Sequence, residues 1–133
     1  MKRDLSSERV TVWEGKHLRV RRCGRWEYVE RAKAAGGVAI VAVTDDQKLL
    51  LIEQHRVPMG QSVIELPAGL VGDVEGSETE ELIEAAKREL IEETGYEARA
   101  MIFLMAGPSS PGLTNEVNTM FRARGVRCVG SAG

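Results

Sequence analysis

The sequence predicts an α+β domain, in which a mixed β-sheet is packed between helical layers and an antiparallel strand meander precedes it. Three observations support this prediction. Residues 9–31 alternate weakly between apolar and polar side chains, as short half-exposed strands do. Residues 36–44, GGVAIVAVT, form a nearly continuous apolar run, which is typical of a strand covered on both faces. Residues 77–94 follow an amphipathic helical pattern, so strands and helix must pack in layers.

The composition indicates a single soluble globular domain. The chain has 133 residues, of which 43% are hydrophobic and 29% charged, and a net charge of −2. This balance favours neither nucleic acid nor a membrane as a partner, and no apolar run approaches the roughly 18 residues of a membrane span. Cys23 and Cys128 are too few for a disulfide framework. With no signal peptide recognisable, we expect a cytoplasmic protein.

The N-terminal strands, residues 1–33, form the first of two expected parts of the chain. Gly15 and Gly24 mark the turns between them. This part is basic and residues 73–97 are strongly acidic, which suits a polyanionic substrate held between the two, although two solvated faces would give the same charges. Trp26 stands in these strands, where its ring could pack in the protein or stack on a base.

Further strands lie on either side of the helix. After the strand at residues 36–44, the polar run Asp45-Asp46-Gln47 predicts a turn, and residues 48–55 are expected to pair with that strand. Beyond the helix, residues 99–106 predict another apolar strand. A loop over residues 107–116 then leads to a last strand over residues 117–126.

The helix is predicted to run from Ser77 to Thr94. Ser77 and Glu80 have the spacing of a capping box, and Gly95 follows the last turn as a stop signal. At about 100° per residue the helix has one apolar stripe, made of Leu82, Ile83, Ala86 and Leu90 with Ala85 on its margin.

Two glutamates interrupt the apolar face of this helix. Glu89 and Glu93 lie one turn apart within the stripe, and Glu92 lies beside them. A run of glutamates is usually a solvated helix face, but carboxylates on the packing side repel each other and would be desolvated. A hard divalent cation removes the conflict, because Mg²⁺ prefers oxygen ligands. We therefore expect Mg²⁺ here, with Mn²⁺ as an alternative.

Residues 88–96, RELIEETGY, resemble the REUxEExGU end of the Nudix box, where U is a bulky aliphatic or aromatic residue. Gly69 corresponds to the first glycine of the box, and Glu80 corresponds to the glutamate in its middle. Ten residues separate these two here, against five in the family pattern, which indicates an insertion in the loop before the helix. The resemblance implies a Nudix fold, an α/β/α sandwich, with residues 34–133 as the catalytic domain and without the usual C-terminal strand and helix.

The segment WEYVER is similar to a W-E-x-V-x-R run of the ADP-ribose and ADP-sugar pyrophosphatases within this superfamily. The resemblance implies that Trp26, Glu27 and Arg31 bind the substrate, with the aromatic ring stacked on adenine. In that subgroup the N-terminal strands are exchanged across a homodimer. A homodimer is therefore expected, with an adenine site built from both subunits.

Two runs between the meander and the helix resemble the same subgroup. An arginine at a strand end is, by itself, more often a surface charge. In EQHRVP, the resemblance implies that Arg56 corresponds to an arginine that contacts substrate phosphate. In ELPAGL, the carbonyl of Ala68 corresponds to a metal ligand, in a segment that would make a tight turn in any case. We also expect Leu70, which ends this run, to contact the substrate.

The loop after the helix completes the resemblance. Pro111 is similar to the downstream proline that marks ADP-ribose hydrolysers, and Glu116 is either a charge at a strand edge or a carboxylate that activates the attacking water. The expected function is metal-dependent hydrolysis of ADP-ribose to AMP and ribose 5-phosphate, with Glu92, Glu93 and Glu116 as catalytic residues. The alternatives are a hydrolase for another nucleotide sugar and a Nudix-fold regulator that binds ADP-ribose or an NAD-derived ligand without cleaving it.

Overall fold

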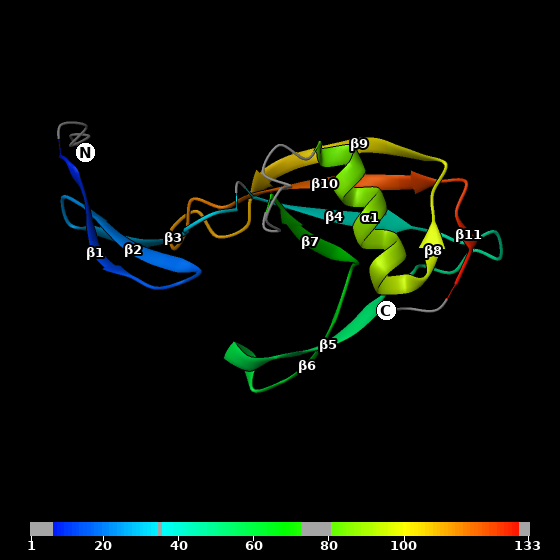
Figure 1. Cartoon of the computed structure of the whole chain (residues 1–133), viewed down its shortest axis with the longest axis horizontal. Helices are drawn as coiled ribbons and strands as arrows, with labels where there is room; N and C mark the ends of the chain where they lie inside the picture. Colours follow the sequence, from blue (N-terminus) through cyan, green and yellow to red (C-terminus); the bar gives the residue numbers. More distant parts are fainter. Residues whose placement is uncertain (1–6, 35, 73–80, 131–133) are drawn as a thin grey trace.

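The computed structural model describes residues 7–34, 36–72 and 81–130. Its centre is a four-stranded sheet in which β4 and β10 run parallel and both outer pairs are antiparallel. The strands are, in sheet order, β7 (Ala68–Val71), β4 (Gly36–Ala42), β10 (Val117–Arg124) and β9 (Ala100–Pro108). The helix α1 (Leu82–Thr94) lies across this sheet (Figure 1). The predicted combination of a mixed sheet with a packed helix is confirmed.

The helix α1 is held by apolar packing against the sheet. A helix of 13 residues is marginal in water by itself, so its stability depends on the face that it buries. Gly95 ends the helix as predicted, with φ 74° and its N–H bonded to the Ile91 carbonyl at 2.9 Å. The buried core joins side chains of the helix and of all four strands, together with one residue beyond β10: Ala85, Ala86, Leu90, Val38, Ile40, Ala42, Val71, Met101, Phe121, Ala123 and Val126.

The start of the helix differs from the prediction. Glu81 is extended, with φ −66° and ψ 143°, and the helix begins at Leu82, so the predicted start at Ser77 is wrong. The expected capping box of Ser77 and Glu80 lies outside the described residues. Of the predicted apolar stripe, Ala85, Ala86 and Leu90 are fully buried, whereas Leu82 and Ile83 are each 43% exposed.

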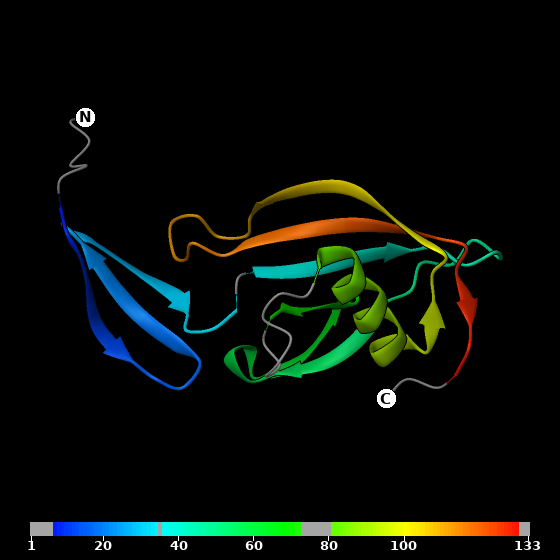
Figure 2. The ribbon, with the colours of Figure 1, turned by 45° about the horizontal axis from the view of Figure 1, so that its top comes forward.

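The N-terminal strands form a separate sheet. β1 (Arg9–Glu14), β2 (Leu18–Cys23) and β3 (Trp26–Arg31) pair antiparallel in that order, which confirms the predicted meander. This sheet lies to one side of the central sheet in both views (Figures 1 and 2). Its strand β3 contacts the loop before β10, where an isolated bridge joins Val29 and Thr114.

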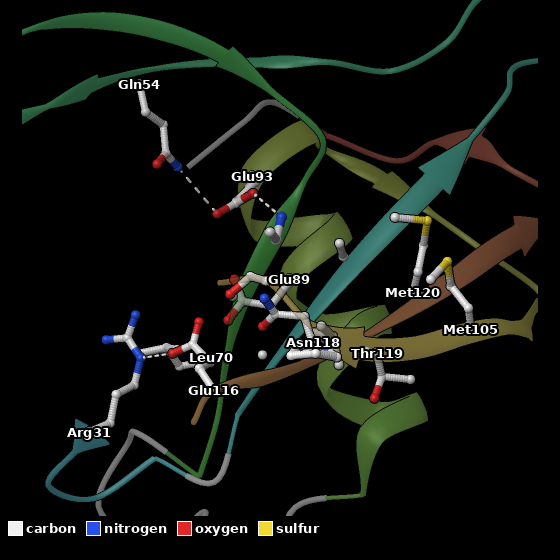
Figure 3. A pocket seen from close by; sticks show the side chains of 18 of the residues that line it. Arg31, Gln54, Leu70, Glu89, Glu93, Met105, Glu116, Asn118, Thr119 and Met120 are labelled. Atoms are coloured by element: carbon white, nitrogen blue, oxygen red, sulfur yellow. Dashed lines mark hydrogen bonds and ion pairs between the residues drawn. The ribbon is translucent and has the colours of Figure 1, made fainter. Parts of the chain in front are cut away.

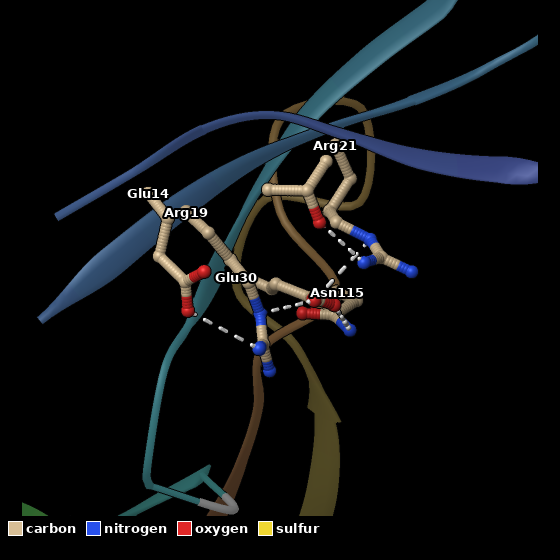
Figure 4. A network of polar contacts seen from close by, with 6 residues as sticks. Glu14, Arg19, Arg21, Glu30 and Asn115 are labelled. Carbon is tan, nitrogen blue, oxygen red and sulfur yellow. Dashed lines mark hydrogen bonds and ion pairs between the residues drawn. The ribbon is translucent and has the colours of Figure 1, made fainter.

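Glu30 on β3 connects the meander to the loop between β9 and β10 by hydrogen bonds. Its carboxylate accepts hydrogen bonds from Arg19 Nε at 2.7 Å and from Asn115 Nδ2 at 3.2 Å (Figure 4). Beside it, the backbone N–H of Val29 donates to the Leu113 carbonyl at 2.8 Å. These contacts place the loop that carries Glu116 against β3.

The segment after β4 does not pair as predicted. The turn at residues 45–47 forms, but the pairing ends at an isolated bridge between Val43 and Leu49. Two backbone hydrogen bonds flank this bridge, from Thr44 N–H to the Lys48 carbonyl and from Leu50 N–H to the Ala42 carbonyl. The reason is that β7 and β10 already occupy both edges of β4. The chain instead forms a hairpin of its own, from β5 (Ile52–Arg56), the short 3-10 helix η1 (Val57–Met59) and β6 (Gln61–Glu65).

The described chain is completed by two short strands, β8 (Tyr96–Glu97) and β11 (Arg127–Cys128), which pair with each other. Within the described residues α1 is the one α-helix, so one helical layer of the expected sandwich is visible. In that same part of the chain no helix is both long and apolar enough to cross a membrane.

Candidate active site

A cavity of about 660 Å³ lies between α1, the central sheet and the end of the meander. Charged and amide side chains from β3, β5, α1, β10 and the loop before β10 converge on it (Figure 3). They are Arg31, Gln54, Arg56, Glu89, Glu93, Glu116 and Asn118. Segments distant in the sequence thus supply both carboxylates and guanidinium groups to one space.

Most of the residues predicted for the site line this cavity. They are Arg31, Arg56, Ala68, Leu70, Glu89, Glu93 and Glu116. Trp26 instead lines a second cavity of about 330 Å³, together with Tyr28 and residues of the loop before β10. Glu27 and Glu92 belong to the lining of neither of these two cavities. The Glu92 carboxylate faces Arg88, whose Nη1 lies 3.2 Å away.

Glu89 projects from α1 against the backbone of Gly69. Its side chain is only 12% exposed, and Arg88 Nη1 donates to its carboxylate at 2.9 Å. Burial raises the pKa of Glu89, and the neighbouring Arg88 partly opposes that shift. A Cβ at Gly69 would overlap the Glu89 carboxyl group, with Oε2 at 2.5 Å. The box glycine therefore provides the space in which this carboxylate lies.

Glu93 is fixed one turn further along the helix. Its carboxylate accepts the backbone N–H of Ala68 at 3.0 Å and the Gln54 Nε2–H at 3.4 Å (Figure 3). Burial raises the pKa of Glu93 as well, because desolvation outweighs these two hydrogen bonds and the nearby Arg56. Ionisation of either helix carboxyl group in the folded protein therefore costs free energy. A nearby positive charge would offset that cost.

This donor set fits a hard divalent cation. Glu89 and Glu93 present carboxylate oxygens to the same cavity as the backbone of Ala68, and Mg²⁺ is commonly bound by one or two carboxylates while it keeps waters and substrate phosphates. Within the described residues no cluster of three or more His, Cys, Asp and Glu side chains could hold a metal by itself. Water and substrate oxygens would therefore complete the coordination.

Both arginines of the cavity are paired with carboxylates. Arg56 binds Glu65 in a fork, from Nε at 3.0 Å and from Nη2 at 2.7 Å, and this hydrogen bonding raises the pKa of Arg56. Arg31 Nε donates to Glu116. These pairs hold the guanidinium groups at the cavity wall before any ligand binds.

Three residues of this arrangement were not predicted from the sequence. Gln54 could have been found, because it lies two residues before Arg56 and alternate residues of a strand share a face. Asn118 is a residue of a type depleted in strands, within the sequence of β10, and this could have drawn attention to it. Nothing in the sequence indicated that Glu65 would pair with Arg56.

The second cavity is formed where β3 meets the loop before β10. Trp26 is 60% exposed there, and the buried hydroxyl of Tyr28 has no hydrogen-bond partner in the described part of the chain. Arg9, Pro111, Thr114 and Asn115 also line it. Because β3 carries Trp26 to this cavity and Arg31 to the first, the two cavities lie along the same strand.

Comparison with known proteins agrees with this architecture. Residues 33–124 match the family model of the NUDIX domain. The methanol dehydrogenase activator of Bacillus methanolicus is 36% identical over 97 residues, covering 73% of this chain and 50% of the relative. The ADP-ribose pyrophosphatase of Bacillus subtilis (strain 168) is 39% identical over 94 residues, covering 71% and 48%. The chain thus spans about half the length of these relatives.

A solved structure described as an ADP compounds hydrolase supports the fold. It superposes with a TM-score of 0.72 at 23% identity, covering 95% of this chain and 69% of that one. The matched domain model includes β4, β10 and the helix that carries Glu89 and Glu93. The chain belongs to the Nudix family.

Proposed function

We propose that this chain hydrolyses the diphosphate of ADP-ribose in the presence of Mg²⁺, releasing AMP and ribose 5-phosphate. The observation that supports this most directly is the shared cavity of Glu89, Glu93, Arg31 and Arg56. Carboxylates suit a cation, and guanidinium forks suit a diphosphate. The relative from Bacillus subtilis that is named an ADP-ribose pyrophosphatase supports the same substrate.

The residues of the cavity have different roles in the proposed hydrolysis. A bound Mg²⁺ would neutralise charge on the diphosphate and lower the pKa of a coordinated water. The Ala68 N–H and Gln54 hold the Glu93 carboxylate in place, and Arg56 orients the diphosphate. Water forms a new bond to one phosphorus, the bridging P–O bond breaks, and its electron pair leaves with the other phosphate. Glu116 accepts the proton of the water in this scheme.

Glu92 and Ala68 complete the proposed metal site. The Ala68 backbone lines the cavity, which supports its carbonyl as a ligand beside Glu89 and Glu93. Glu92 is exposed and paired with Arg88. We keep it as the outer carboxylate of the set and as a catalytic residue, since it follows Glu89 by three positions on the same helix.

Arg56→Lys is expected to raise the KM for ADP-ribose by about 10-fold with a smaller change in kcat, because a lysine cannot form the two parallel hydrogen bonds of a guanidinium fork. Steady-state kinetics with Mg²⁺ present measure both constants. Arg127→Lys is the matched control, because Arg127 also pairs with a glutamate, Glu97, but lies outside the cavity. An unchanged KM in Arg56→Lys would show that this side chain does not bind the diphosphate.

We further propose that the second cavity takes the adenine ring against Trp26, and that Glu27, next to Trp26 in sequence, and Arg31, in the larger cavity, also bind the substrate. The exposure of Trp26 beside an open cavity supports this. Trp26→Ala is expected to raise the KM for ADP-ribose by roughly 10-fold, since base stacking contributes about 1–3 kcal/mol per base. Trp26→Phe keeps a stacking ring and should recover most of the loss. Equal constants in all three proteins would rule out stacking on Trp26.

A homodimer with exchanged N-terminal strands is the proposed assembly, and the cytoplasm the proposed location. Every residue of β1 is exposed, including Val10 at 43% and Val12 at 51%, and a second copy would cover these side chains. Both cysteines are free thiols, which suits a reducing compartment. Light scattering should give the mass of two chains, and the mass of one chain at micromolar concentration would contradict the dimer.

A further inference from the structure

Asn118 on β10 differs from the other polar residues of the larger cavity. Among the charged and amide side chains that line it, Asn118 alone has no hydrogen bond or ion pair within the described residues. Its side chain points from β10 into the cavity (Figure 3). The others are all paired: Arg31 with Glu116, Arg56 with Glu65, Gln54 with Glu93, and Glu89 with Arg88.

Gly37 on the neighbouring strand makes room for this amide. The two residues face each other across the parallel β4–β10 pair. A Cβ at Gly37 would stand 2.5 Å from Asn118 Oδ1 and 3.2 Å from the Gly69 carbonyl oxygen. Gly37 is not among the described glycines with a positive φ, so its backbone conformation does not require glycine. Glycine at this position leaves the space that the Asn118 side chain occupies.

An unpaired amide at this place has a chemical use. Asn118 is half-buried, and its amide is not among the buried polar atoms that lack a partner in the described chain, so it stays open to the cavity. A ligand oxygen that enters the cavity can accept its N–H without breaking a hydrogen bond within the described protein. Each guanidinium group of the cavity has a carboxylate partner, whereas the Asn118 NH₂ is a donor for which the described part of the chain supplies no acceptor.

We infer that Asn118 is a substrate-contacting residue whose amide NH₂ donates a hydrogen bond to a diphosphate oxygen, positioned by the space at Gly37. This inference rests on the proposed hydrolysis of a nucleoside diphosphate sugar. It adds a neutral donor to the groups that select a diphosphate. It also gives a role to the asparagine that β10 carries where the strand passes the cavity.

The test measures binding of the non-cleavable analogue α,β-methylene ADP-ribose with Mg²⁺ by titration calorimetry, and turnover of ADP-ribose. Asn118→Leu should weaken analogue binding by about 10-fold or more, the usual scale for a hydrogen bond to a charged group. Asn118→Asp should weaken it further, because a carboxylate repels the diphosphate. Wild-type affinity in Asn118→Leu would overturn the inference, and wild-type affinity in Asn118→Asp would overturn the role of the NH₂ as donor.

Gly37→Ala tests the same contact from the opposite strand. Its methyl group displaces the Asn118 amide, so the single variant should also lose about 10-fold in affinity, whereas adding it to Asn118→Ala should cost little, since coupled residues are not additive. Additive losses would contradict the coupling. Arg122→Ala, on β10 outside the cavity, is the control and should bind like the wild type.

The outcomes separate this inference from the proposed function. If the wild type cleaves ADP-ribose and binds the analogue, but the Asn118 variants behave like it, the inference alone is wrong. If the wild type neither cleaves ADP-ribose nor binds the analogue, the proposed function is wrong and the inference falls with it.

Discussion

Glu93→Gln is expected to lower Mg²⁺-dependent turnover of ADP-ribose by at least about 100-fold, the scale on which removal of one electrostatic group slows an enzyme. Glutamine has the same shape and can still accept the Ala68 N–H, which binds Glu93 at 3.0 Å. What it loses is the negative charge that a divalent cation requires. Turnover measured over a range of Mg²⁺ concentrations checks this, and unchanged turnover would remove Glu93 from the metal site.

The fold of this variant should remain intact. Burial raises the pKa of Glu93, so the folded protein holds the proton more tightly than the unfolded chain does. Ionised Glu93 therefore destabilises the metal-free protein above that raised pKa, and the cost disappears as the pH falls through it. In EDTA at neutral pH, Glu93→Gln should be at least as stable to urea as the wild type. Glu97→Gln, exposed and outside the cavity, should leave turnover unchanged.

Gly69→Ala should be nearly inactive while remaining folded. The new methyl group would overlap the Glu89 carboxyl group, which is the end of a flexible side chain and can move away. The backbone at Gly69 is not among the described positive-φ glycines, so alanine is conformationally acceptable. We expect a loss of turnover of about 100-fold, as for a displaced electrostatic group, with only a small shift in the melting temperature.

Two measurements distinguish displacement of Glu89 from general damage. Gly130→Ala is the matched control, because a Cβ there meets no atom within 4 Å, and its turnover should equal that of the wild type. Gly69→Ala should also bind Mg²⁺ more weakly in calorimetry without nucleotide. Wild-type Mg²⁺ affinity and turnover in this variant would show that the space at Gly69 has no role in the metal site.

The predictions that succeeded rest on local physical signals. Gly95 was expected to end the helix and does so in a left-handed conformation, because few other residues adopt it readily. Glu89 and Glu93 were expected together from helical periodicity alone, and both line the larger cavity. The apolar run at residues 36–44 predicted a strand covered on both faces. The strand β4 forms there, with Val38, Ile40 and Ala42 buried on one face and the alternate residues Ala39 and Val41 half-buried.

The predictions that failed depend on information outside their own segment. Residues 48–55 look like a partner for β4, but β7 and β10 occupy its two edges, and β10 comes from the far end of the chain. The strand β7 was not predicted, because the proline and glycine of ELPAGL indicate a turn. The pairing of Arg56 with Glu65 and the space that Gly37 leaves for Asn118 arise only when strands are brought together.

The central claim is metal-dependent cleavage of a nucleoside diphosphate sugar, and one measurement tests it most directly. AMP release from ADP-ribose, ADP-glucose and NADH, and the corresponding nucleotide products from GDP-mannose and 8-oxo-dGTP, should be followed with Mg²⁺ and with EDTA. We predict cleavage that requires Mg²⁺ and is fastest for ADP-ribose. Thermal stabilisation by ADP-ribose without release of AMP under either condition would contradict the account and identify a protein that binds this nucleotide without hydrolysing it.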